Sequence, residues 1–407
     1  MNYEIKNLWW VETILADMPD SNSTTVLILV KAWSIYETAQ TNGISHFLEH
    51  MFFKGWKKYT NPKIVAETID EIWWEFNAFT WEEYAWYYVK SSPEHVNISI
   101  DVLWDMLVDA QFPKDELERE KWVIIQEYMM YEDMPRELAM EKFKRFYYGD
   151  NSFGWSTLGT VENIKSFNQD HFFSHKNSLY TKDNLVVIVA WKIVDSKALE
   201  QLIWETFKDL PSATSYPKPV FLNQKPSLKS DFFDKKTQQN HLVIWAKWFD
   251  MFDDQRYASN ILWTILWWNM SSRLFQEIRE KRGLCYYISS FHDSSFHDWV
   301  FYIRAWIEKD RFDYGLKSIY QQLEDIAKGN FSQEDFDKAV WYFTWIRQIN
   351  LETSDQIAWF VWHQYLFKKE IESLPSLLDN YRKLTLDDVK SVANIIKDDN
   401  LYLYYIS

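Results

Sequence analysis

Glycine, cysteine and positive charge are all scarce in this sequence of 407 residues. The one cysteine is Cys285, so no disulfide can form within the chain, and a bound metal would depend on His and carboxylate ligands. The net charge of −15 disfavours a nucleic-acid groove and an anionic membrane surface, because both require clustered Lys and Arg. We therefore expect no nucleic-acid partner and no membrane partner.

Long apolar runs are also missing. The first twenty residues lack the uninterrupted apolar core of a signal peptide, and no apolar run reaches 18 residues anywhere in the chain. Because 47% of the residues are hydrophobic, the chain can bury a substantial core, and its length favours two domains. We expect a cytoplasmic protein.

Tryptophan is as abundant as glycine is rare. The chain has 24 Trp and 8 Gly, which together make up about 8% of its residues, close to the roughly 7% that glycine alone usually takes. Tryptophans stand where turn chemistry favours glycine, at Trp9-Trp10, Trp73-Trp74 and Trp267-Trp268, and at Trp33 and Trp191 after strand-like runs. We hypothesise that most of them are codons that the source organism reads as glycine. The alternative is a tryptophan-rich binding surface.

The segment GISHFLEHMFFK, residues 43–54, places two histidines and a glutamate within five residues. If it is helical, as its apolar residues suggest, His46 and His50 project from one face, with Glu49 beside them. Two imidazoles on one face can hold zinc, and an adjacent carboxylate can act as a general base on water. This H-x-x-E-H order is the inverted form of the H-E-x-x-H motif. A catalytic zinc site still needs a third protein ligand.

Two glutamates in the helical segment 113–148 are candidates for that ligand. Glu120 and Glu127 are seven residues apart, so two helical turns place them on one face. Glu127 lies 77 positions after His50, and a helix that crosses the motif helix could bring it to the metal. A solvated acidic face is the alternative, and the spacing leaves both open.

Residues 75–90 are aromatic and strand-like, and they could form a sheet edge on which an extended peptide pairs as an added strand. Asn77, Ala78 and Phe79 are the candidate substrate-binding residues of this strand. A hairpin buried in the core is equally compatible with the sequence.

Strand-like segments recur at a nearly constant spacing. TTVLILVKAW and HLVIWAKW are offset by 215 positions, YAWYYVK and WVFYIRA by 215, and NLVVIVA and NLYLYYI by 216. The repeat predicts two similar halves, each a sheet with helices against it. A polar, proline-bearing stretch at 213–228 is the expected linker between domains 1–212 and 229–407. The second half has no H-x-x-E-H.

These features together resemble the pitrilysin (insulinase) family of zinc peptidases, in particular its half-length members, which include the mitochondrial processing peptidase subunits. The segment NSFGWSTLGTVENI, residues 151–164, is similar to the family signature G-x-x-I-L-G-T, with Leu158 in place of Ile. The resemblance covers nearly the whole chain. It implies an α+β fold of two homologous domains, each a mostly antiparallel sheet with helices packed against it, which form half of a clam-shell chamber.

The resemblance also implies roles for single residues. His46, His50 and Glu127 would bind one Zn²⁺ per chain, Glu49 would be the general base, and Glu120 would support the site without ligating the metal.

In the second half, Arg279 and Tyr286 match a family pair that contacts the substrate backbone and can stabilise an oxyanion. Without the resemblance, Arg279 would be assigned to an ion pair on a helix and Tyr286 to a sheet. The family strand G-G-x-x-N-A appears with Trp73-Trp74 in place of its glycines, a departure that would crowd the peptide-binding edge and that supports the recoding hypothesis.

Four other histidines deserve comparison with the motif. His171 and His175 are four residues apart, but no Glu lies between them, and we do not expect a second metal site there. His292 and His297 are five apart and are interpreted as ordinary surface or sheet residues.

The expected function is that of a zinc-dependent endopeptidase, which hydrolyses peptides or unfolded, presequence-like segments inside a closed dimeric chamber. A homodimer is expected, with a heterodimer as the alternative. A non-catalytic or regulatory subunit of a processing-peptidase-like heterodimer is the alternative function, although such subunits typically lose the motif.

Overall fold

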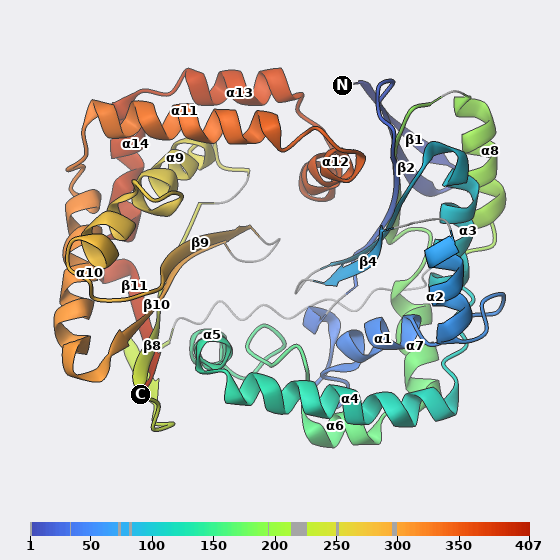
Figure 1. Cartoon of the computed structure of the whole chain (residues 1–407), viewed down its shortest axis with the longest axis horizontal. Helices are drawn as coiled ribbons and strands as arrows, with labels where there is room; N and C mark the ends of the chain where they lie inside the picture. Colours follow the sequence, from blue (N-terminus) through green and yellow to red (C-terminus); the bar gives the residue numbers. More distant parts are fainter. Residues whose placement is uncertain are drawn as a thin grey trace. The chain divides into compact units, whose positions relative to one another are not determined.

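Two β-sheets with helices packed against them account for most of the chain (Figure 1). The computed structural model describes residues 2–32, 34–71, 75–80, 84–193, 195–212, 226–249, 252–294 and 299–407. Trp33, Trp73-Trp74, His297 and residues 213–225 of the expected linker lie outside the described residues.

The chain divides into two compact units that are not continuous in sequence. The first comprises Met1–Met129, Asn151–Val220 and Asn350–Ile371, and the second comprises Met130–Asp150, Phe221–Ile349 and Glu372–Ser407. Each unit therefore includes a segment from the other half of the sequence. The domain boundaries at 212 and 229 stay a prediction.

The first unit contains a six-stranded sheet. Its strands in spatial order are β1 (Asn2–Leu8), β2 (Val11–Asp17), β6 (Leu185–Trp191), β3 (Thr24–Val30), β5 (Ala85–Ser91) and β4 (Glu75–Thr80). β2 and β6 pair in parallel, and the other neighbours are antiparallel. β3 is buried along its whole length, which agrees with its continuous run of β-branched and aliphatic residues.

The second unit contains a five-stranded sheet built on the same plan. Its strands in spatial order are β7 (Ser230–Phe233), β11 (Leu401–Ile406), β8 (Gln239–Lys247), β10 (Trp299–Glu308) and β9 (Ile288–Ser294). β8 pairs antiparallel with β10 and β11, as β3 pairs antiparallel with β5 and β6. The sequence repeat therefore corresponds to a structural repeat, and the predicted α+β class with mostly antiparallel sheets is confirmed.

The helices fall into the two halves of the sequence. Those before the linker are α1 (Ile44–Phe52), α2 (Pro62–Glu71), α3 (Val96–Leu107), α4 (Lys114–Asp133), α5 (Pro135–Tyr148), α6 (Val161–Ser166), α7 (Gln169–Leu179) and α8 (Ser196–Phe207). Those after it are α9 (Arg256–Trp267), α10 (Phe312–Ala327), α11 (Gln333–Ile349), α12 (Ser354–Lys368), α13 (Leu374–Arg382) and α14 (Leu386–Val392). None of the helices in the described ranges is long and apolar enough to cross a membrane.

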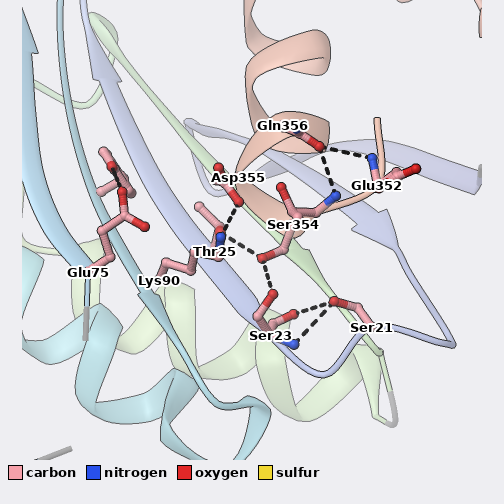
Figure 2. Close-up of polar contacts among 11 residues, drawn as sticks. Ser21, Ser23, Thr25, Glu75, Lys90, Glu352, Ser354, Asp355 and Gln356 are labelled. Carbon is pink, nitrogen blue, oxygen red and sulfur yellow. Dashed lines mark hydrogen bonds and ion pairs between the residues drawn. The ribbon is translucent and has the colours of Figure 1, made fainter. Parts of the chain in front are cut away.

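Helix α12 belongs to the second half of the sequence but packs on the sheet of the first unit, against β2, β3 and β6. Figure 2 shows how its first turn is attached. The Ser354 hydroxyl lies 2.8 Å from that of Ser23 and 2.9 Å from that of Thr25, and Lys90 forms a 2.6 Å ion pair with Asp355. Successive residues of a strand point to opposite faces of the sheet. Thr25 faces α12, and its neighbour Val26 faces the core that contains α3, so α12 covers the face of β3 opposite to α3.

Helix α5 occupies the equivalent position in the second unit, although it precedes the linker. It packs on β8 and β11, where Phe143 and Tyr147 join Trp245 and Tyr402 in one apolar cluster. Arg304 of β10 donates to both carboxylate oxygens of Glu137 at 3.0 Å and fixes the start of the helix. Each sheet is therefore covered on one face by a helix from the other half of the chain.

The turn between β1 and β2 has a geometry that favours glycine. Leu8 pairs with Val11, so Trp9 and Trp10 form a two-residue hairpin loop. Their φ angles are 50° and 81°, and positive φ at both positions defines the turn type in which Asn-Gly and Gly-Gly are preferred. This conformation supports the hypothesis that both positions are glycine in the natural protein.

Several tryptophans have a buried indole N–H group that meets no acceptor in the described part of the chain. Indole N–H groups usually find an acceptor when they are buried. Among the described residues, the buried indole nitrogens of Trp86, Trp191, Trp245, Trp248 and Trp362 find no acceptor. These unpaired donors are a second observation in favour of the recoding hypothesis.

Candidate metal centre

The motif segment forms helix α1, and close backbone packing fixes its first turn. Gly43 precedes the helix with φ 96°, a left-handed conformation that glycine adopts without strain. Its Cα approaches the loop of the 151–164 signature so closely that a Cβ on Gly43 would lie 2.6 Å from the Leu158 carbonyl oxygen. A Cβ on Gly159, which has φ 77°, would lie 2.3 Å from the Asn42 carbonyl oxygen. The signature segment therefore serves as a support for the motif helix.

A buried carboxylate caps the same turn. Glu37 accepts hydrogen bonds from the backbone N–H groups of Gly43 at 2.9 Å and Ser45 at 2.8 Å, and from the Asn42 amide at 3.0 Å. Burial raises the pKa of Glu37 to about 7, although these hydrogen bonds oppose the rise. The carboxylate satisfies N–H groups that have no partner within the helix and lies at the positive end of the helix dipole. Glu37 was not predicted from the sequence.

The two faces of α1 differ as the motif predicts. Phe47, Leu48 and Met51 are buried in the core of the first unit, whereas His46 and His50 remain partly exposed, with ring centroids 4.7 Å apart. The predicted helix and the predicted direction of its histidines are therefore both present.

Helix α4 brings Glu127 to these histidines. Its Oε2 lies 3.6 Å from Nε2 of His46 and 3.5 Å from Nε2 of His50, and one ligand atom from each residue lies within 4.8 Å of the others. Tetrahedral zinc with ligands at about 2.0–2.1 Å separates neighbouring ligand atoms by roughly 3.3–3.4 Å. Two imidazoles and a carboxylate at this spacing fit a zinc ion, and the described residues contain no other group of this kind.

Glu120 lies seven residues before Glu127 on α4 and contacts His50 at the ring nitrogen that faces away from Glu127. Its side chain is buried, and Oε1 is 2.8 Å from Nδ1 of His50, on the side of the ring opposite to Glu127. Its second oxygen, Oε2, lies 2.6 Å from Nζ of Lys54. Glu120 therefore contacts a candidate ligand without facing the ligand cluster. The alternative that the sequence left open, a solvated acidic face for Glu120 and Glu127, does not hold.

The charges of the site favour a cation. Burial, followed by the neighbouring His50, lowers the pKa of His46 to about 4. Burial also acts against the charged form of His50, but hydrogen bonds and charges from Glu120 and Glu127 outweigh it and raise the pKa to about 9. In the metal-free protein, Glu120 and Glu127 therefore favour the protonated form of His50. Metal binding has to displace a proton from His50, because a ligating imidazole is neutral.

Glu49 lies on α1 between the two histidines and is partly exposed. The buried hydroxyls of Tyr87 and Tyr180 lie 2.7 Å apart. Burial raises the pKa of both phenols, and the charge of Glu49 adds to the rise in each. Glu49 therefore interacts electrostatically with this phenol pair while it remains accessible to water.

The candidate substrate residues lie on β4, which is the edge strand of the first sheet. β4 pairs with β5 on one side, and no strand from the described part of the chain pairs with its other side. Ala78 is buried, whereas Phe79 is 42% exposed and stacks against Trp86. The hairpin of β4 and β5 therefore contributes to the core, and within the described ranges the outer edge of β4 is not covered by another strand. Substrate binding at this edge stays a prediction.

Arg279 and Tyr286 belong to the second unit, in which they lie next to each other. Arg279 is in a π-helical turn, Phe275–Glu280, with its guanidinium 5.1 Å from the Tyr286 ring centroid. It lies 3.6 Å from Glu280, its sequence neighbour. Tyr286 precedes β9 and is 76% exposed, so it is not a sheet residue.

The other histidines have structural contacts. His175 is buried and forms a 3.0 Å hydrogen bond with the Ser45 hydroxyl, and Nδ1 of His171 accepts from the backbone of Asn168 at the start of α7. His292 lies on β9 with its ring 4.6 Å from that of Trp263. None of these histidines belongs to a group of three or more potential metal ligands among the described residues.

Comparisons with known proteins identify the family of similar chains. Residues 12–161 match the sequence model of the insulinase family, peptidase family M16, and residues 166–342 match the model of the peptidase M16 inactive domain. An uncharacterized zinc protease of Bacillus subtilis is 30% identical over 398 residues, which is 98% of this chain and 96% of that protein. One from Rickettsia bellii is 32% identical over 340 residues, 83% of this chain and 81% of that protein.

The fold is also found among solved structures. The crystal structure of a protease from Helicobacter pylori matches with a TM-score of 0.92 at 21% identity, over 100% of this chain and 99% of that chain. A peptidase M16 inactive domain from Pseudomonas fluorescens matches with a TM-score of 0.88 at 16% identity, over 100% of this chain and 98% of that chain. From its motif, its fold and these relatives, the chain belongs to the insulinase family of peptidases, family M16.

Proposed function

We propose that the protein is a zinc-dependent endopeptidase that hydrolyses peptides or unfolded, presequence-like segments. The observation that carries the proposal is the convergence of His46, His50 and Glu127 at the spacing of a zinc-ligand set, with Glu49 on the same helix. When bound, zinc would polarise the scissile carbonyl and make water more acidic. The related zinc proteases support the activity by their names.

The residues of the chain provide the remaining chemistry. Glu49 takes a proton from the attacking water and returns it to the leaving amine, which is the role of a general base and then a general acid. The free edge of β4, at Asn77, Ala78 and Phe79, holds the substrate extended by backbone hydrogen bonds. Arg279 and Tyr286 provide a guanidinium and a phenol for the developing oxyanion.

The alternative function is a non-catalytic or regulatory subunit. The domain named inactive corresponds to residues 166–342, whereas the motif lies in the part that matches the insulinase model. Because all the motif side chains are in place, we favour the catalytic function. We also propose that it acts in the cytoplasm, as the sequence analysis predicts.

Glu127→Gln is expected to abolish zinc binding and peptide hydrolysis together, because a neutral amide is a poor zinc ligand. Zinc content of the purified chain, measured alongside hydrolysis of an unfolded peptide by the chain alone, tests this. Glu118→Gln, on an exposed part of the same helix, is the matched control and should keep both. Unchanged zinc content in Glu127→Gln would show that another residue is the third ligand. Glu120 would then be the next candidate.

We further propose that the active unit is a homodimer that encloses a chamber, in which the zinc residues of one protomer act with Arg279 and Tyr286 of its partner. Mixing inactive Glu49→Gln and Arg279→Ala chains should then restore up to about a quarter of the parental activity, since half of the dimers carry one intact composite site. A mixture of Glu49→Gln and Glu127→Gln, which damage the same site, should recover nothing. No recovery in the first mixture after verified subunit exchange would count against the composite site, and recovery only with a motif-less neighbour would indicate a heterodimer.

A further inference from the structure

The two histidines of the candidate centre are held very differently. Nδ1 of His50 lies 2.8 Å from Glu120, whereas Nδ1 of His46 is buried and has no hydrogen-bond partner among the described residues. Imidazole ligands of metals almost always donate their second N–H group, which fixes the ring and selects the coordinating nitrogen. At this site only His50 receives that support, so the geometry of the pair depends on the position of the Glu120 carboxylate.

Lys54 fixes that position. It follows the end of α1, four residues after His50, and its Nζ lies 2.6 Å from Oε2 of Glu120, while Oε1 contacts His50. The two oxygens of one buried carboxylate are thus each engaged, one by the lysine and one by the histidine. A carboxylate held at both oxygens cannot rotate about its terminal torsion without breaking one of the two contacts.

The local backbone keeps the lysine in place. The Lys54 N–H donates to the Met51 carbonyl at 3.2 Å, which closes the last turn of α1, and the side chain is only 24% exposed. Gly55 follows with φ 140°, and a Cβ there would lie 2.8 Å from the Thr60 carbonyl oxygen, so the chain turns immediately after Lys54. The lysine therefore points back to α4 instead of extending into solvent.

We propose that Lys54 is a positioning residue of the metal centre, which orients the Glu120 carboxylate so that Glu120 orients the His50 ring with Nε2 toward the metal. The inference rests on the proposed function, because it needs a metal at His46, His50 and Glu127. The proposed role of Lys54 is more than a stabilising ion pair, because Lys54 influences the binding of the metal through Glu120.

The test measures zinc affinity of the metal-free full chain by competition with a chromophoric chelator. Loss of an outer hydrogen-bond partner typically lowers metal affinity by about 10–100-fold, so Lys54→Met should bind zinc that much more weakly. Lys54→Arg, which keeps donors for the carboxylate, should recover most of the loss. Lys63→Met removes a lysine from an exposed ion pair with Glu67 and should bind zinc as the parent does.

A double variant separates positioning from general stabilisation. If Lys54 acts through Glu120, Lys54→Met should add little to Glu120→Gln, because the two changes remove parts of one connected unit. With Co²⁺ as a spectroscopic probe, Lys54→Met should alter the visible absorption bands of the bound ion, and Lys54→Arg should restore them.

The outcomes separate the inference from the proposed function. A parent chain that binds no zinc would overturn both. If the parent binds zinc, equal affinity in Lys54→Met, fully additive losses in the double variant, or a loss that Lys54→Arg does not reduce would each overturn the inference alone. Should Lys54→Met fail to fold, the affinity and cobalt spectrum of Lys54→Arg decide, since a parental result supports the positioning role and a loss as large as that of Glu120→Gln contradicts it.

Discussion

Glu49→Gln is expected to remain folded and to bind zinc, but to hydrolyse peptides about 10²–10⁴-fold more slowly than the parent, which is the usual contribution of a general base. The amide has nearly the shape of the carboxylate but cannot take a proton from water. Because Glu49 is not among the three residues whose ligand atoms converge, the change leaves the candidate ligands in place.

Initial rates on an unfolded peptide, together with zinc content and thermal unfolding, measure these effects separately. Glu67→Gln, on the exposed side of α2, is the control for a change of charge and should be neutral in all three. Hydrolysis by Glu49→Gln at more than a few per cent of the parental rate would show that another group is the base. Loss of zinc from this variant would instead assign a ligand role to Glu49.

The second large effect concerns the tryptophans. The natural protein is expected to have glycine at positions 9 and 10, because a two-residue hairpin loop with φ of 50° and 81° suits glycine and strains an indole-bearing residue. A non-glycine residue held in such a conformation costs about 1–3 kcal/mol. Trp9→Gly combined with Trp10→Gly should therefore stabilise the recombinant chain by a few kcal/mol at most, which thermal unfolding can detect.

Mass spectrometry of the protein from its native source decides the question directly. The tryptic peptide of residues 7–31 contains both positions, and residues 64–90 contain Trp73 and Trp74. A chain made from a synthetic gene that has the tryptophan codon UGG at these positions gives the reference peptides with tryptophan. Native peptides that carry tryptophan at these positions would refute the recoding hypothesis, and a peptidase with indoles beside its substrate strand would then need explanation.

Local patterns predicted the parts of the site that lie on one element. The spacing of His46, Glu49 and His50 is a property of a single helix, so periodicity alone predicted their common face. Glu127 comes from a helix far away in the sequence, and its spacing left a solvated face equally open. The family resemblance, which uses information beyond one sequence, was needed to choose it.

Glu37 and Lys54 could not be predicted, because their partners are chosen by tertiary packing. Glu37 caps a helix whose first residue is seven positions later, so it matches no local capping pattern. Lys54 is a lysine at the end of an amphipathic helix, which in a sequence reads as an ordinary solvated charge. The spacing of strands likewise predicted two similar sheets but contained no information on which helix covers which sheet.

Helices α5 and α12 occupy equivalent positions in the two units. α5 starts at Pro135 and α12 at Ser354, an offset close to that of the repeated strands, and each covers the sheet of the opposite half. A single ancestral half would have left one sheet face bare, with residues such as Thr25 and Trp86 in water. Two copies that exchanged this helix would have covered both faces, as in a domain-swapped dimer. The two halves of the present chain have the organisation of such a pair, and all the candidate metal ligands come from the first half.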